Sequence, residues 1–293
     1  MTDLWGYHIW LEMWLGDMAG GAYFSAFLFE RFTGNKQLLR PATFLAIPLV
    51  VAALVLSLID LGEPIRFWHM LVSVKPLSPL WLGTFLSQSF VGIAVIMAIL
   101  WIIESRMAEQ AGRNLRRVIA ALSWINVIFA GSLMAYSGVL MSSTNIPLWA
   151  GTDLLPSMLV ASAVATGIAI LVFSSLIYRS AWQIQGKTLS LLAGVIPLVL
   201  IIQLVLVGTF IALAGSSSTK GAGEAVKALT TGSLAIPFWI TLAAFLVSIG
   251  LVAAVRGKDI EKKAVRSSLI LSSVCVILGG LLIRAVIVIG GQL

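Results

Sequence analysis

The sequence predicts an all-α, polytopic membrane protein of eight transmembrane helices with both termini on the outer side. Its composition, eight long apolar runs and an uneven distribution of Lys and Arg indicate this fold class. The 293 residues are 59% hydrophobic and 11% charged, with a mean hydropathy of +1.03. Soluble domains are roughly half apolar and a quarter charged. These values exclude a cytosolic enzyme, a disordered scaffold and a nucleic-acid-binding protein, despite the net charge of +7.

Each of the eight runs is long enough for a helix of about 20 residues, the length that crosses a bilayer. The connections between them are polar or contain Gly and Pro, and none is long enough for a soluble domain. We therefore expect a single integral membrane domain over residues 1–293. Pro48 and Pro197 fall inside the second and sixth runs and are expected to kink those helices. The predicted helices cover residues 6–29, 41–59, 80–103, 118–141, 155–177, 188–213, 236–255 and 267–289.

The basic residues predict the orientation of the protein. Fourteen of the 19 Lys and Arg residues follow the first, third, fifth and seventh predicted helices, and four lie in the other loops. The remaining one, Arg284, lies inside the last helix. Excess Lys and Arg usually mark the cytoplasmic loops of membrane proteins. Both termini, and the loops after the second, fourth and sixth helices, are therefore expected on the outer side.

The supply of metal-binding side chains limits the cofactors of this protein. Cys275 is the single cysteine, and His8 and His69 are the two histidines. A single cysteine excludes an intrachain disulfide and a zinc or iron–sulfur site with several cysteine ligands from this chain alone. Two haems with two histidine ligands each would need four histidines. We expect the protein to contain neither haem nor an iron–sulfur cluster, and no catalytic metal.

Ionisable side chains inside a membrane are costly and are therefore candidates for function. A rise of about 1.5 Å per helical residue gives the depth of each of these side chains in the membrane. His8 and Glu12 fall in the outer third of the first predicted helix, and Asp17 lies near its middle. Tyr136 and Arg284 fall in the outer parts of the fourth and eighth helices. These positions predict a functional site in the outer half of the membrane.

The first and fourth predicted helices supply the candidate catalytic residues. His8 and Glu12 are four residues apart and share a helix face, where an imidazole and a carboxyl could exchange protons with a small molecule. The alternative is that His8 is interfacial and Glu12 bonds a neighbouring helix. Tyr136, with Gly131 and Gly138 giving space on either side, could donate a hydrogen bond to a ligand carbonyl. It could also belong to the aromatic belt of the membrane interface.

Three further polar residues are predicted to form a proton path together with Glu12. These are Asp17, Asn126 and Arg284. Arg284 is the obvious partner for Asp17, and their pairing could equally be structural. Gly16 and Gly20, on either side of Asp17, form a small-xxx-small pattern that lets another helix approach closely.

Several sequence segments resemble the NrfD-like family of polysulfide reductase membrane subunits. The most specific is DLGEPIRFW at residues 60–68, followed by a Ser-Pro pair and a helix start with Trp and Gly at residues 78–83. The Gly-rich MAGGAYF at residues 18–24, YSGVLM at 136–141 and GGLLIRAVIVIGGQ at 279–292 are similar too. The resemblance extends over essentially the whole sequence.

This resemblance implies a haem-free, quinone-reactive membrane anchor of an oxidoreductase complex in a bacterial or archaeal inner membrane. Such an anchor exchanges electrons between menaquinone and a four-cluster ferredoxin-like [4Fe–4S] subunit docked on the outer face. That subunit in turn connects to a molybdopterin (Mo or W) catalytic subunit. The resemblance implies that His8, Glu12 and Tyr136 line the quinone site. Asp60 and Arg66 lie in the signature segment and either border that site and the docking surface or form a local pair.

Two other functions are compatible with the sequence. Eight helices with a few buried charges also fit a secondary transporter or an ion or proton channel. Transporters often contain inverted repeats and broken helices at mid-membrane, whereas here the charges gather on one side and no repeat is evident. A passive anchor would not need the buried charges of Glu12, Asp17 and Arg284, although helix pairing could explain some of them.

Overall fold

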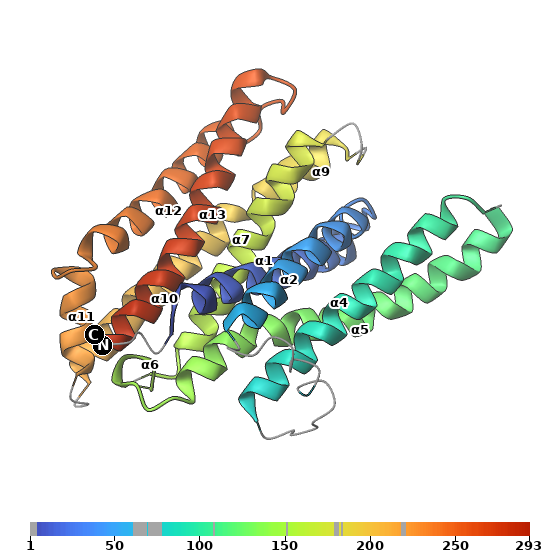
Figure 1. Cartoon of the computed structure of the whole chain (residues 1–293). Coiled ribbons are helices and arrows are strands. Elements are labelled where there is room, and N and C mark those ends of the chain that lie inside the picture. The colour runs from blue at the N-terminus through green and yellow to red at the C-terminus, as the bar shows by residue number, and fades with distance from the viewer. Residues whose placement is uncertain are drawn as a thin grey trace.

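All regular structure in the described part of the protein is helical. The computed structural model describes residues 5–60, 69, 78–107, 109–150, 152–178, 182, 184–217 and 221–293. Long helices run side by side, with short helices at some of their ends (Figure 1). The helices are α1 (Tyr7–Thr33), α2 (Leu39–Asp60), α4 (Pro79–Glu104), α5 (Glu109–Ser142), α6 (Pro147–Ala150), α7 (Leu155–Ile177), α9 (Gly186–Ala193), α10 (Ile196–Ser216), α11 (Ala222–Thr230), α12 (Ala235–Val255) and α13 (Lys263–Gln292).

The predicted class of a polytopic, all-helical membrane protein is confirmed. Among the described residues, seven helical segments are long and apolar enough to cross a membrane, with α9 and α10 counted together as Gly186–Ser216. The sequence predicted eight. The difference is α1, which has 27 residues but is less apolar because it carries Glu12, Asp17 and several glycines.

Helix α1 lies at the centre of the bundle. It packs against α2 and α5 on one side and against α7 and α13 on the other (Figure 1). Its middle is fully enclosed, with a continuous run of buried residues from Gly16 to Tyr23. The other long helices therefore surround the middle of α1 and hide its polar groups from lipid.

The two ends of the described structure meet on one side of the bundle (Figure 1). The backbone N–H of Trp5 donates to Oε1 of Gln292 at 2.8 Å, and Nε2 of Gln292 donates to the carbonyl of Trp5 at 3.1 Å. The Trp5 ring packs on Trp149, whose Nε1 donates to the carbonyl of Ile287 at 2.9 Å. These contacts tie the start of α1 and helix α6 to the end of α13.

The sixth predicted helix, residues 188–213, is interrupted in the structure. Helix α9 ends at Ala193, a turn covers Gly194 and Val195, and Pro197 lies in the first turn of α10. Proline suits this position because the first helical N–H groups have no partner within the helix. The expected kink at Pro197 is thus a break. Pro48 stays inside the continuous α2.

Small residues allow α1 to approach α5 and α7 closely. Gly20 packs against the backbone carbonyl of Ala130 on α5, and Gly21 packs against the backbone of Ala163 on α7. Gly167 of α7 in turn lies against the backbone of Gly21. The expected close contact is therefore present at Gly20. It is absent at Gly16, where an added Cβ would meet no atom within 4 Å among the described residues.

We expect the Gly167→Ala substitution to lower the thermal unfolding midpoint, because the new Cβ would overlap backbone atoms of Gly21 and Ala22. Overpacking of this kind costs about 1–3 kcal/mol. Circular dichroism of the purified protein during heating in detergent measures the effect. Gly250→Ala on α12 is the matched control, since a Cβ there has open space. Equal midpoints for the two variants would contradict the close crossing of α1 and α7.

Candidate functional site

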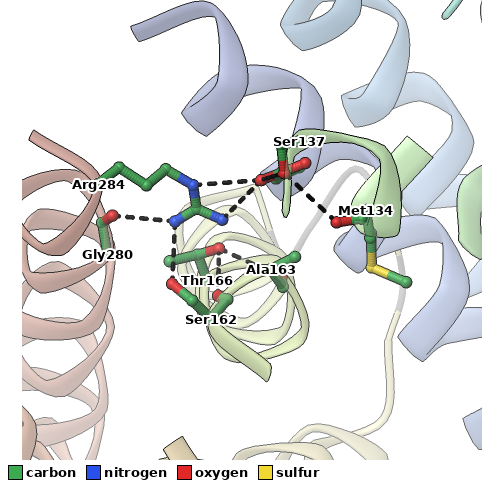
Figure 2. A network of polar contacts seen from close by, with 8 residues as sticks. Met134, Ser137, Ser162, Ala163, Thr166, Gly280 and Arg284 are labelled. Atoms are coloured by element: carbon green, nitrogen blue, oxygen red, sulfur yellow. Dashed lines mark hydrogen bonds and ion pairs between the residues drawn. The ribbon is translucent and has the colours of Figure 1, made fainter. Parts of the chain in front are cut away.

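A buried ion pair joins the first and last long helices at the centre of the bundle. Asp17 of α1 and Arg284 of α13 are each 2% exposed. Nη2 and Nε of Arg284 lie 3.0 and 3.2 Å from Oδ2 of Asp17. The hydroxyl of Ser137 on α5 donates to the same carboxylate oxygen at 2.9 Å (Figure 2). The predicted partnership of Asp17 and Arg284 is confirmed.

The other side of the Arg284 guanidinium donates hydrogen bonds to α7 and to α13, its own helix. Nη1 of Arg284 donates to Oγ of Ser162 and to the carbonyl of Gly280, both at 2.9 Å (Figure 2). The network therefore links α1, α5, α7 and α13 through one arginine. Buried charges are tolerated when they are paired and hydrogen-bonded in this way. Among the hydrogen bonds of the described residues, none connects the fully buried Asn126 to this network.

A cavity of about 260 Å³ lies beside the ion pair, between α1, α2, α4 and α5. Asp17 and Ser137 belong both to the network and to the wall of the cavity, and Glu12 and Tyr136 line it as well. We call it the Glu12–Tyr136 pocket. The remaining lining residues are mostly apolar or small: Met13, Gly16, Val50, Ala53, Leu54, Ser57, Leu80, Gly83, Thr84, Ser87 and Leu133.

The phenol of Tyr136 is positioned by a glycine on the neighbouring helix. Gly83 of α4 packs directly against the ring and hydroxyl of Tyr136, so closely that a Cβ at this position would overlap them. Gly138 does not provide the space that the sequence predicted, because it packs against the backbone of Pro156. Within the part of the protein that the structure describes, no protein group hydrogen-bonds the Tyr136 hydroxyl. Tyr136 itself lines the pocket.

The structure brings together some of the predicted site residues. Glu12 and Tyr136, from helices far apart in the sequence, line one pocket. His8 is half-buried near the start of α1 and does not line the pocket. Its ring contacts that of Tyr7, with centroids 3.7 Å apart and planes tilted by 37°. Asp60 ends α2, and its side chain lies outside what the structure describes, as does the whole of Arg66. Their predicted part in the site stays a prediction.

Sequence reasoning missed Gly83, Ser137 and Ser162. A serine in an apolar helix usually bonds a carbonyl of its own helix, so nothing in the sequence distinguishes Ser162 from the other serines. Gly83 belongs to the signature region, where nothing marks it as the partner of Tyr136. The available signal for Ser137 was its place directly after Tyr136 in the YSGVLM segment.

The fold and the site together define a polytopic, all-helical membrane protein with a largely apolar pocket, which Glu12, Asp17 and Tyr136 also line, beside a buried ion pair. The family model described as polysulphide reductase, NrfD, matches residues 1–293, so the protein belongs to the NrfD family. It is also similar to the C subunit of polysulfide reductase from Wolinella succinogenes, with 24% identity over 257 residues. That alignment covers 83% of this protein and 80% of the relative. The family resemblance of the sequence motifs is confirmed.

Proposed function

We propose that the protein is the quinone-reactive membrane subunit of a respiratory oxidoreductase complex. It would exchange electrons between menaquinone or menaquinol and a four-cluster [4Fe–4S] subunit, which connects to a molybdopterin catalytic subunit. The observation that carries this proposal is the Glu12–Tyr136 pocket of about 260 Å³ in a member of the NrfD family. The similarity to a polysulfide reductase subunit supports a place in a multi-subunit redox complex.

The residues of the pocket fit the headgroup of a lipid quinone. Ligand sites for drug-sized molecules occupy roughly 300–1,000 Å³, with apolar walls and a few convergent polar groups. The volume of this pocket lies just below that range, in keeping with a ring system alone. Val50, Leu54 and Leu133 supply apolar wall, and the Tyr136 hydroxyl supplies a donor without an acceptor among the described residues.

A menaquinone bound in this pocket would supply two-electron, two-proton redox chemistry. The Tyr136 hydroxyl would donate a hydrogen bond to a carbonyl oxygen of the ligand and so orient it. The Glu12 carboxyl would accept or release protons at the same end of the pocket. Asp17 has one oxygen bound by Arg284 and Ser137, so it holds the wall of the pocket in place. A path for protons through Asp17, Asn126 and Arg284 is part of the proposal.

We further propose that α1 is an eighth span and that both termini lie on the outer face, where the iron–sulfur subunit docks. Two observations support this. The contact between Trp5 and Gln292 supports an even number of crossings, because the two ends of the described structure lie together. The 27 residues of α1 rise about 40 Å, more than the roughly 30 Å hydrocarbon core. The Lys and Arg asymmetry then assigns the side of the termini to the outside of a bacterial or archaeal inner membrane.

The test is quinone-linked turnover of the purified complex carrying Tyr136→Phe or Glu12→Gln. Loss of one ligand hydrogen bond in Tyr136→Phe should lower turnover about tenfold. Loss of a proton donor and acceptor in Glu12→Gln should lower it about 100-fold. Activity of the catalytic subunit with an artificial dye should not change in either variant.

Matched control variants are Tyr178→Phe and Glu224→Gln, because both side chains are exposed and lie outside the pocket. Both controls should keep wild-type turnover with quinone. Full quinone-linked turnover in both Tyr136→Phe and Glu12→Gln would reject the pocket as the quinone site.

A further inference from the structure

A second cavity lies at the opposite end of the same four helices. It has a volume of about 400 Å³ and is bounded by the end of α1, the start of α2, the end of α4 and the first half of α5. Four cationic side chains line it: Arg31, Lys36, Arg40 and Arg116. We call it the basic pocket. Nothing in the proposed quinone chemistry uses it.

The two carboxylates of the basic pocket already have partners. Oε1 of Glu30 accepts hydrogen bonds from the backbone N–H groups of Leu38 and Leu39, both at 2.8 Å, and so caps the start of α2. Oε1 of Glu104 lies 2.6 Å from Nε of Arg116. The acidic side chains therefore serve a helix end and one of the four cations.

Three cations of the basic pocket form no ion pair within 4 Å among the described residues: Arg31, Lys36 and Arg40. The Glu30 carboxylate interacts electrostatically with Arg31 and Lys36 over a longer range, and the four cations exceed the two carboxylates of the pocket by two positive charges. The guanidinium of Arg31 is held over two aromatic rings, 4.7 Å from the centroid of Trp124 and 5.2 Å from that of Phe27. Cation–π contacts of this kind fix the position of a charge. The pocket thus presents positive charge that is partly preorganised.

The inner wall of the basic pocket is apolar and aromatic. Phe27, Trp101 and Ile119 line it and are buried. A cationic rim over an apolar wall matches a ligand with an anionic group attached to a hydrocarbon part. Arginine and lysine at such positions bind phosphate oxygens through charge-assisted hydrogen bonds.

We propose that the basic pocket binds a phosphate-bearing anion, presented as the headgroup of an anionic phospholipid. Basic pockets between membrane helices on the cytoplasmic side are suited to anionic headgroups. The basic pocket lies at the ends of the helices that are far from the termini of the protein. The distribution of Lys and Arg assigns these helix ends to the cytoplasmic leaflet. Free inorganic phosphate offers the same anionic oxygens. The experiment below distinguishes it from the lipid headgroup.

The experiment is native mass spectrometry of the purified complex, delipidated and then titrated with phosphatidylglycerol or with zwitterionic phosphatidylcholine. We expect saturable binding of phosphatidylglycerol, weakened about 30-fold in the double variant Lys36→Gln/Arg40→Gln, as expected for two lost cations. The matched control is Arg113→Gln/Arg117→Gln, which removes two exposed cations near the same membrane face. The control should bind within about twofold of wild type.

Inorganic phosphate is added as a competitor in a separate arm. Displacement of phosphatidylglycerol at a similar concentration would support the site with free phosphate as its ligand, and failure to displace would support the lipid. Equal weakening in the pocket and control variants, or equal binding of phosphatidylcholine, would overturn the proposal. If the Lys36→Gln/Arg40→Gln variant does not fold, Arg31→Lys tests the same site. This substitution keeps the positive charge but removes the planar guanidinium, so it should still weaken the binding of phosphatidylglycerol. Unchanged phosphatidylglycerol binding in Arg31→Lys would then overturn it.

Discussion

Replacing Arg284 by methionine is expected to destabilise the helical bundle by about 3–5 kcal/mol. The substitution leaves the buried Asp17 carboxylate without its counter-charge and Ser162 without a donor. The expected result is a lower unfolding midpoint in detergent and a lower yield of assembled complex. Arg113→Met, at an exposed position of α5, is the matched control and should change neither quantity. A wild-type midpoint for Arg284→Met would contradict a stabilising role for the pair.

The double variant Asp17→Leu/Arg284→Met separates a structural role of the ion pair from a role in proton transfer. Replacing both members of a buried pair by apolar residues is often neutral or stabilising, so the unfolding midpoint should recover. Because the proposed path for protons runs through Asp17 and Arg284, we expect quinone-linked turnover to stay low in this stable variant. Recovery of turnover together with stability would instead assign the pair a purely structural role.

Replacing Gly83 by valine is expected to abolish quinone-linked turnover, with a loss of at least about 100-fold. The new side chain would occupy the space of the Tyr136 ring and drive the phenol into the Glu12–Tyr136 pocket. Displacing a positioning group by as little as about 1 Å can cost that much in rate. Turnover with quinone and with an artificial dye, measured on the same preparation, separates this effect from loss of the catalytic subunit.

Gly92→Val is the matched control for Gly83→Val. It lies on the same helix, where a Cβ would meet no described atom within 4 Å. Any general effect of a β-branched residue in α4 should appear equally in both variants. Similar turnover in the two variants would contradict the contact between α4 and the phenol.

Hydropathy predicted much of the fold because each lipid-exposed helix needs a long apolar run. Residues 155–177 were predicted as a helix and are the bounds of α7. Hydropathy failed where a helix is not apolar. Helix α5 begins at Glu109, upstream of the predicted start at residue 118, because its first turns carry Arg113, Arg116 and Arg117 and leave no apolar signal.

The candidate site was partly predictable because buried charge is costly. That cost singled out Asp17 and Arg284, and the depth argument placed Glu12 and Tyr136 at a similar level. The contact of Gly83 with Tyr136 could not be predicted, because it depends on how α4 packs on α5 and not on spacing along either helix. The role of Ser162 could not be predicted either, because its hydrogen bond with Arg284 depends on how α7 packs against α13.

The ion pair also constrains the order in which the protein can mature. Asp17 is synthesised near the start of the protein, and its partner Arg284 follows 267 residues later. Until the last helix leaves the ribosome, the first helix carries a carboxylate into the membrane without its cation. A polypeptide that stops before α13 therefore leaves Asp17 without Arg284 and cannot complete the buried network.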